Sequence, residues 1–199
     1  MNKYITSDYV VSALANLPQL VFEVTDACNL RCKYCAYGEF YEDYDCRENK
    51  MLSTEKAIRL IDYLAEYWNS NLNTSADKNI TISFYGGEPL LNFPFIEAVV
   101  KHIKNNVHCP HRRFSFSMTT NAILLHKYMD FLQENNFHLL VSLDGNKEND
   151  GYRMDKAGHS SFERVVTNVD MLRDKYPDYF LRYVNFNAVL HNRNSVESK

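Results

Sequence analysis

The feature that most constrains the fold of this chain is a repeated alternation of strand-like and helix-like segments. Short apolar runs alternate with stretches whose apolar residues recur at helical spacing. Such strand-then-helix units with short connections favour parallel strands, right-handed crossovers and helices packed outside. The sequence therefore predicts an α/β fold of about five β/α units, either barrel-like or open. The predicted strands are Leu20–Val24, Ile80–Phe84, Phe114–Met118, Leu139–Ser142 and Tyr183–Leu190.

Helix signals fall between these strands, and one more helix precedes the first strand. Ser53 offers an N-cap to a helix that extends to Trp68, and a capping box over Ser160–Glu163 is predicted to start the last helix. A short helix over Ser7–Asn16 leads into Pro18, which ends it. We therefore predict a helical lead-in over residues 1–17 and one core domain over residues 18–199. The two remaining helices are predicted around Phe95–Ile103 and Leu125–Leu132.

The composition favours a packed globular protein and excludes several classes of partner. Hydrophobic residues make up 45% of the 199 residues, with only 6 Gly and 5 Pro, which argues against disorder. The net charge of -3 gives no excess of positive charge that would attract nucleic acid or an anionic membrane. No apolar stretch approaches the roughly 18 residues that a membrane span needs. We therefore expect a cytoplasmic protein with neither nucleic-acid nor membrane partners.

Unusual polar groups follow each of the first four predicted strands. A cysteine cluster follows the first strand, and the turn Gly86–Pro89 follows the second. Thr119–Asn121 follows the third, and Ser142–Gly145 follows the fourth. Loops at the carboxyl ends of parallel strands converge on one edge of the sheet, while the strands stay rigid. The chemistry of this chain is therefore predicted at that edge.

Three of the five cysteines, Cys28, Cys32 and Cys35, are tightly clustered, while Cys46 lies nearby and Cys109 stands alone. In a reducing compartment such clustering indicates a metal site in preference to a disulfide framework. Three thiolates at this spacing can surround one iron-sulfur cluster and leave one iron without a protein ligand. The alternative is structural zinc with Cys46 as the fourth ligand.

The segment Cys28–Cys35, with the letters CNLRCKYC, resembles the signature of the radical S-adenosylmethionine (radical SAM) enzymes. The resemblance implies a partial (β/α)6 radical SAM barrel of parallel strands with outer helices. It further implies that Cys28, Cys32 and Cys35 hold a [4Fe-4S] cluster whose open iron is chelated by S-adenosylmethionine. Tyr34 occupies the aromatic position of the signature and is expected beside the adenine.

The turn Gly86-Gly87-Glu88-Pro89 resembles the Gly-Gly-Glu turn of the same family, which binds the methionine ammonium of the cofactor. Glycines permit a close backbone approach to a ligand, and a carboxylate suits an ammonium group. Taken alone, these four residues would only be a turn before a helix.

Further along the chain, Ser142 and Arg153 resemble residues of peptide-modifying members that contact the methionine carboxylate or nearby groups of the cofactor. Asn121 and Asn187 end strands and are expected to line the pocket, and Asp144 is expected to contact the substrate or the ribose of the cofactor. The alternatives are an ordinary solvated Arg153 and a simple strand-end turn at Asp144-Gly145. No residue is assigned as a catalytic acid or base.

Within the family, the chain is similar to anaerobic sulfatase-maturating enzymes and SPASM-type peptide maturases. Those carry a C-terminal extension that binds further iron-sulfur clusters, and only Cys46 and Cys109 remain outside the signature here. Two thiolates are too few to bind another cluster alone. We therefore expect that residues 18–199 are an incomplete core, truncated at the C-terminal end.

The activity that the resemblance implies is one-electron reductive cleavage of S-adenosylmethionine to a 5′-deoxyadenosyl radical. That radical would abstract hydrogen from a peptide or protein substrate, as in post-translational peptide maturation. A reductant such as flavodoxin or ferredoxin would supply the electron. Two alternatives stay open: a radical SAM enzyme that acts on a small molecule, and a non-catalytic binding module stabilised by zinc.

Overall fold

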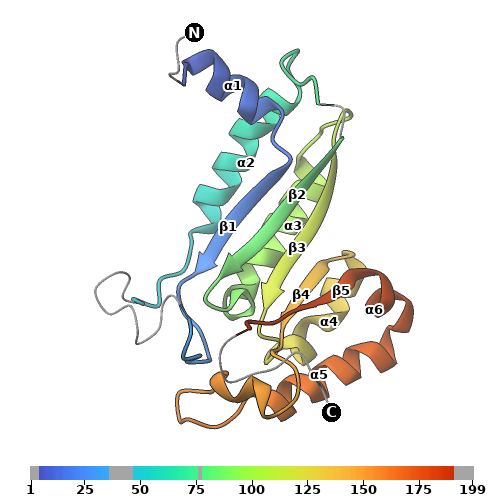
Figure 1. Cartoon of the computed structure of the whole chain (residues 1–199). Coiled ribbons are helices and arrows are strands. Elements are labelled where there is room, and N and C mark those ends of the chain that lie inside the picture. The colour runs from blue at the N-terminus through green and yellow to red at the C-terminus, as the bar shows by residue number, and fades with distance from the viewer. Residues whose placement is uncertain (1–4, 36–46, 76–77, 191–199) are drawn as a thin grey trace.

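A five-stranded parallel sheet forms the centre of the computed structural model, which describes residues 5–35, 47–75 and 78–190. The strands follow the order β1-β2-β3-β4-β5, so each strand pairs with its neighbours in sequence. The arrowheads of β1, β2 and β3 point toward the same end of the sheet (Figure 1), and every pairing between neighbouring strands is parallel. The predicted α/β class with parallel strands is confirmed. The strands are β1 (Gln19–Thr25), β2 (Asn79–Gly86), β3 (Arg113–Thr120), β4 (His138–Ser142) and β5 (Val184–Asn187).

The helices that connect the strands lie on one face of the sheet, and no helix covers the opposite face in the described part of the chain (Figure 1). We refer to that opposite face as the open face. None of the described helices is both long and apolar enough to cross a membrane. The helices are α1 (Ser7–Ala15), α2 (Thr54–Trp68), α3 (Phe93–Asn106), α4 (Leu125–Glu134), α5 (Phe162–Lys175) and α6 (Pro177–Tyr183), with short 3-10 helices η2 (Pro89–Asn92) and η3 (Asn149–Tyr152).

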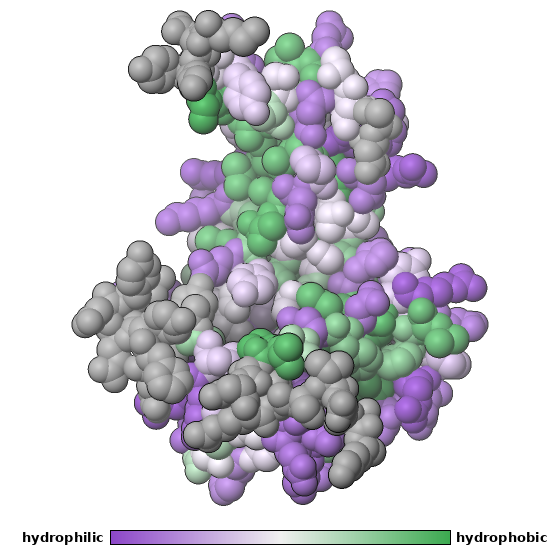
Figure 2. Space-filling model, in the orientation of Figure 1, coloured by the Kyte–Doolittle hydropathy of each residue, from purple (hydrophilic) through white to green (hydrophobic). Residues whose placement is uncertain are grey.

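Alternation of side chains along each strand separates the core from the open face. In β2, Ile80, Ile82 and Phe84 are buried in the hydrophobic core. The side chains between them have the opposite direction, because successive residues of a strand point to opposite faces. Ser83 and Tyr85 therefore belong to the open face. Figure 2 shows that face as a mixture of hydrophilic and hydrophobic residues.

Of the two predicted helix starts, one forms as expected and the other does not. The Ser53 side chain accepts a hydrogen bond from the Lys56 amide at 3.4 Å, so the N-cap of α2 is confirmed. The predicted capping box over Ser160–Glu163 is wrong, because the N-cap of α5 is Ser161 and its side chain caps no amide. Its hydroxyl instead donates to the carbonyl of Arg153 at 3.0 Å. Ser161 therefore fixes the segment that precedes α5 and does not cap the helix.

The fifth strand is shorter than predicted at both ends. Residues Pro177–Tyr183 form α6, which the sequence analysis did not predict, so β5 begins only at Val184. Beyond Asn187 the chain leaves the sheet, because the Val189 amide donates to Asp144 Oδ1 at 2.9 Å. A side chain from the loop after β4 thus captures a backbone group that a longer strand would have used for pairing. The predicted boundary between lead-in and core at residues 17 and 18 stays a prediction.

Candidate functional site

A cavity of about 400 Å³ lies at the carboxyl ends of the strands, and all three clustered cysteines line it. Cys28, Cys32 and Cys35 come from the loop after β1. We refer to this space as the site cavity. Residues at the ends of β2, β3 and β4 line it as well, which confirms the predicted convergence of these loops at the carboxyl ends of parallel strands. The remaining lining residues are Leu30, Tyr34, Arg47, Tyr85, Gly86, Gly87, Thr119, Thr120, Asn121, Leu140, Ser142, Asp144, Arg153, Asn187 and Val189.

Two glycines fix the cysteine loop against the end of β2. The Gly87 amide donates to the Thr25 carbonyl at 2.7 Å, and the Glu88 amide donates to the Ala27 carbonyl at 2.8 Å. A Cβ at Gly87 would lie 2.1 Å from the Ala27 oxygen, so only glycine permits this approach. Gly86 is further restricted by its φ of 131°. The turn therefore holds the backbone that leads into Cys28.

Within the described residues, hydrogen bonds reach the sulfur atoms of Cys28 and Cys35. Arg47 Nη2 donates to Cys35 Sγ at 3.1 Å, and the Leu30 amide donates to Cys28 Sγ at 3.4 Å. Burial raises the pKa of the Cys28 thiol and raises that of Cys32 to about 11. Metal ligation needs thiolates, so loading this site with iron would release protons.

The arrangement of the cysteines fits an iron-sulfur cluster. Three thiols share the wall of one cavity, and thiolates are the ligands such clusters require. In the described part of the chain, no three His, Cys, Asp or Glu side chains converge closely enough to hold a single metal ion. Cys46, the fourth ligand in the zinc alternative, lies outside the described residues. When bound, a cluster with S-adenosylmethionine would supply the one-electron chemistry, and Cys28, Cys32 and Cys35 would hold it.

The Glu88 carboxylate lies beneath the site cavity and is not part of its lining. It is fully buried and accepts hydrogen bonds from the Thr120 hydroxyl at 2.8 Å, the Asn121 amide at 2.7 Å and the Leu90 amide at 3.1 Å. Burial raises the pKa of this carboxyl, and the three donors oppose that effect. Pro89 is also buried, at the start of η2. Gly86 and Gly87 are thus the members of the turn that line the cavity, and the predicted contact of Glu88 with an ammonium group stays a prediction.

We expect the Glu88→Ala variant of the cofactor-free chain to lose about 3 kcal/mol of unfolding free energy, since each buried donor left without an acceptor costs about 1–3 kcal/mol. Glu88→Gln keeps one carbonyl oxygen and should lose about half as much. Urea denaturation measures both. Glu97→Ala is the matched control, because Glu97 makes an exposed bridge to Lys101, and it should cost less than about 1 kcal/mol. Equal losses in Glu88→Ala and Glu97→Ala would contradict the structural role of Glu88.

Asn121 connects Glu88 to the cysteine loop. Its backbone amide donates to Glu88, and its Nδ2 donates to Asn29 Oδ1 at 2.7 Å and lies 3.7 Å from Cys28 Sγ. The residue thus lines the cavity, as predicted, and also orients the first cysteine. Ser142, at the end of β4, lines the cavity as well.

Tyr34, Asp144 and Arg153 form one hydrogen-bonded group in the wall of the site cavity. The Tyr34 hydroxyl donates to Asp144 Oδ2 at 2.6 Å and accepts from Arg153 Nη1 at 2.8 Å. Arg153 is only 6% exposed, so the alternative of an ordinary solvated residue is wrong. Asp144 is only 4% exposed and is more than a strand-end turn. Asp150 supports the group from behind, since it accepts from the Asp144 amide at 3.0 Å, and burial raises its pKa to about 6.

Arg47 and Tyr85 line the site cavity, although the sequence did not lead us to predict them there. Arg47 follows an acid-rich stretch and carried no sequence signal, because its partner Cys35 is identified only by the fold. Tyr85 did carry a signal, since it continues the alternation Thr81, Ser83, Tyr85 on the open face of β2 directly before Gly86. Strand alternation combined with the expected site at the strand ends could have predicted Tyr85.

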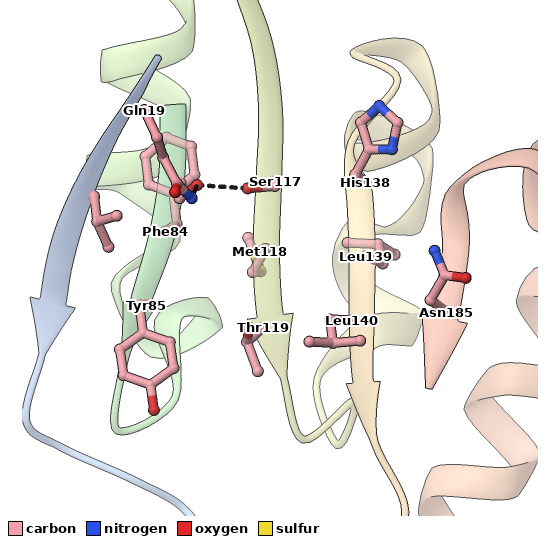
Figure 3. Close-up of a pocket in the computed structure, with 12 residues that line it drawn as sticks. Gln19, Phe84, Tyr85, Ser117, Met118, Thr119, His138, Leu139, Leu140 and Asn185 are labelled. Atoms are coloured by element: carbon pink, nitrogen blue, oxygen red, sulfur yellow. Dashed lines mark hydrogen bonds between the residues drawn. The ribbon is translucent and has the colours of Figure 1, made fainter. Parts of the chain in front are cut away.

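A second cavity, of about 410 Å³, lies on the open face of the sheet (Figure 3). We refer to it as the sheet-face cavity. Tyr85, Thr119 and Leu140 line both cavities, so the two spaces adjoin at these side chains. Farther from the strand ends, Gln19 Nε2 donates to Ser83 Oγ, and Ser83 Oγ shares a hydrogen bond with Ser117 Oγ, both at 2.7 Å. Tyr85, Thr119 and Leu140 therefore mark the boundary between the site cavity and the sheet-face cavity.

Comparisons with known proteins agree with this geometry. A family model described as the Radical SAM superfamily matches residues 22–197. A cysteine-type anaerobic sulfatase-maturating enzyme of Clostridium novyi (strain NT) is 33% identical over 186 residues, which cover 89% of this chain and 46% of that protein. The chain therefore spans about half the length of this relative.

Solved structures of a related protein share the fold. Native anSMEcpe with bound AdoMet matches with a TM-score of 0.68 and 25% identity over 86% of this chain and 43% of that one. The same protein with bound AdoMet and the Kp18Cys peptide matches with a TM-score of 0.65 and 25% identity over 85% of this chain and 42% of that one. With a family model that covers most of its length and a signature of three cysteines on one cavity wall, this chain belongs to the radical SAM superfamily.

Proposed function

We propose that this chain cleaves S-adenosylmethionine reductively at a [4Fe-4S] cluster and abstracts hydrogen from a peptide or protein substrate. The observation that carries the proposal is the adjoining pair of cavities, one lined by the three cysteines and the other open along the sheet. Within this arrangement, Cys28, Cys32 and Cys35 would hold the cluster. Gly86 and Gly87 would offer backbone groups to the methionine end of the cofactor.

The buried Arg153 supports the proposed binding of the methionine carboxylate. A guanidinium group forms strong charge-assisted hydrogen bonds with carboxylates. Arg153 is already oriented by the Tyr34 hydroxyl, and both residues line the site cavity. An oriented side chain loses little conformational entropy when a ligand binds. Ser142 would add a hydroxyl on the same wall.

The lining of the sheet-face cavity favours a peptide over a phosphorylated small molecule. Among the described residues that line it there is no Lys, Arg, Asp or Glu. Its polar groups are hydroxyls, amides and the imidazole of His138, with Gln19, Ser83 and Ser117 already joined in a row. Neutral donors and acceptors match peptide amides, whereas phosphate groups are usually bound by cationic side chains. Two of the similar proteins also support a polypeptide substrate by their names.

The proposal is tested by asking where the abstracted hydrogen comes from. The chain is reconstituted anaerobically with iron and sulfide and supplied with dithionite and S-adenosylmethionine. It is then incubated with the peptide fraction or the small-molecule fraction of a deuterium-labelled extract. We expect about four irons per chain and deuterium in the 5′-deoxyadenosine only with the peptide fraction.

Other outcomes of the same experiment would replace the proposal. Deuterium that comes only from the small-molecule fraction would establish the alternative of a small-molecule enzyme. A colourless protein that holds zinc tightly and forms no 5′-deoxyadenosine would establish the alternative of a binding module. The Cys32→Ala variant is the matched control for background cleavage.

A further inference from the structure

Cys32 lies between two cavities, and one of them has no part in the proposed chemistry. A cavity of about 290 Å³ is lined by Cys32 with its two sequence neighbours and by residues of the segment that follows η3. We refer to it as the outer cavity. Cys32 also lines the site cavity, whereas none of the residues that line the sheet-face cavity borders the outer one. The outer cavity is lined by Arg31, Cys32, Lys33, Met154, Asp155, Lys156, Ala157 and Gly158.

Backbone hydrogen bonds fix the outer cavity to the cysteine loop. The Arg31 amide donates to the Met154 carbonyl at 2.7 Å, and the Lys33 amide donates to the Tyr152 carbonyl at 3.1 Å. Leu30 and Asp155 form an antiparallel bridge beside them. These contacts fasten the two walls of the cavity together. A molecule that docks there would therefore be held in a fixed relation to Cys32.

The outer cavity is cationic, although the chain has a net charge of -3. Among the described residues that line it, three side chains are cationic and a single one, that of Asp155, is a carboxylate. Arg164 Nη2 donates to Asp155 Oδ2 at 3.1 Å, so a further cation offsets that carboxylate. The Lys33 ammonium lies 5.7 Å from the centroid of the Tyr152 ring. A local field of this sign attracts an anionic surface.

We propose that the outer cavity, through Lys33 and Lys156 at its rim, docks an acidic one-electron donor protein beside Cys32. The inference rests on the proposed function, because a chain that holds a redox cluster needs an electron source. The donor loses one electron in each event and is oxidised, and the cluster held by the three cysteines gains that electron. No bond forms or breaks between the two proteins. A donor at this position would leave the sheet-face cavity free for substrate.

A flavodoxin with negative net charge serves as the probe, and titration calorimetry measures its binding to the cluster-free 199-residue chain. We expect the double variant Lys33→Glu/Lys156→Glu to bind at least about ten-fold more weakly than the parent chain. We also expect the parent affinity to fall when salt is raised from about 50 to about 300 mM, because salt screens exposed charges. Lys156→Glu alone should show part of the loss. That single variant leaves the cysteine signature intact.

The matched control is Lys56→Glu/Lys127→Glu, which changes the net charge by the same amount at exposed positions on α2 and α4. It should bind flavodoxin within about two-fold of the parent chain, because a local field acts through the docking surface. If flavodoxin affinity fell equally in both double variants, the net charge of the chain alone would control binding, and the proposal would be overturned. Unchanged binding in Lys33→Glu/Lys156→Glu would overturn it as well. Binding of an acidic peptide to the parent chain, without any binding of flavodoxin, would also overturn the proposal.

A second measurement separates this inference from the proposed function. The reconstituted chain is reduced by flavodoxin or by dithionite, and bleaching of the cluster is followed by stopped-flow absorbance. We expect slower bleaching by flavodoxin in Lys156→Glu, which leaves the cysteine signature intact, and an unchanged rate with dithionite. If 5′-deoxyadenosine forms with dithionite but docking is insensitive to Lys33 and Lys156, the docking surface is wrong and the proposed function stands. If no cluster assembles in the parent chain, the proposed function fails, whereas the calorimetric result is unaffected.

Discussion

Replacement of Cys32 by alanine is expected to abolish cluster assembly and 5′-deoxyadenosine formation. Cys32 lines the site cavity together with Cys28 and Cys35, and the thiolate charges of those two residues both act on it. With two thiolates left, the iron content should fall from about four per chain to below about one after anaerobic reconstitution. Iron analysis, the absorbance spectrum and chromatography of the nucleoside product measure the effect. The fold should persist, because Cys32 is only half-buried.

Cys109→Ala is the control for this variant. Cys109 is buried in the hydrophobic core and lines none of the three cavities described here. Its loss should cost about 1 kcal/mol of stability and leave the iron content unchanged. If Cys32→Ala retained four irons, or if both variants lost iron alike, the assignment of the cluster ligands would be wrong.

Substitution of Gly87 by alanine is expected to have the second-largest effect, although it adds only one methyl group. The new Cβ would lie 2.1 Å from the Ala27 oxygen and 2.6 Å from the Ala27 carbonyl carbon, which are backbone atoms that cannot rotate away. The turn and the cysteine loop would have to separate, and two short backbone hydrogen bonds would be lost with them. We expect a loss of about 3 kcal/mol in unfolding free energy. Reduced iron uptake should accompany it, since the same backbone leads into Cys28.

The matched control for that variant is Gly151→Ala. A Cβ at Gly151 would meet no atom within 4 Å, and the residue does not have a positive φ. Its substitution should change the unfolding free energy by less than about 0.5 kcal/mol. Thermal and urea unfolding of both variants, followed by reconstitution, test the comparison. Equal stability of Gly87→Ala and Gly151→Ala would mean that the close approach of Gly87 to Ala27 is absent in solution.

Several parts of the fold and the site could be predicted because their signals are local in sequence. Alternation over Ile80–Phe84 identified a strand with one buried face, and Ser53 identified the start of α2. The helix α6 escaped prediction because its seven residues contain too few turns to show an apolar period. The capping box failed for a different reason. Ser161 satisfies the carbonyl of Arg153 in place of a helix amide, and that choice depends on a loop eight residues away.

The long-range contacts of the site could not be predicted from local patterns. Tyr34 and Asp144 are 110 residues apart, and Tyr34 and Arg153 are 119 apart, yet the three side chains form one hydrogen-bonded group. Glu88 illustrates the same limit, because its type suits an ammonium ligand while the fold surrounds it with three internal donors. Burial decides between such roles, and burial is a property of the assembled sheet and loops.

By itself the sequence determined the parallel α/β class, the three clustered cysteines of the signature and the two glycines that permit a close backbone approach. These depend on residue type and on spacing within a few positions, which short segments retain in any context. Only the tertiary structure decided which polar side chains meet in the site cavity and that Glu88 lies beneath it. It also decided that Cys32 borders the cationic outer cavity. The physical reason is that parallel crossovers bring the ends of distant strands to one edge, where the packing of each loop against its neighbours sets which groups are exposed.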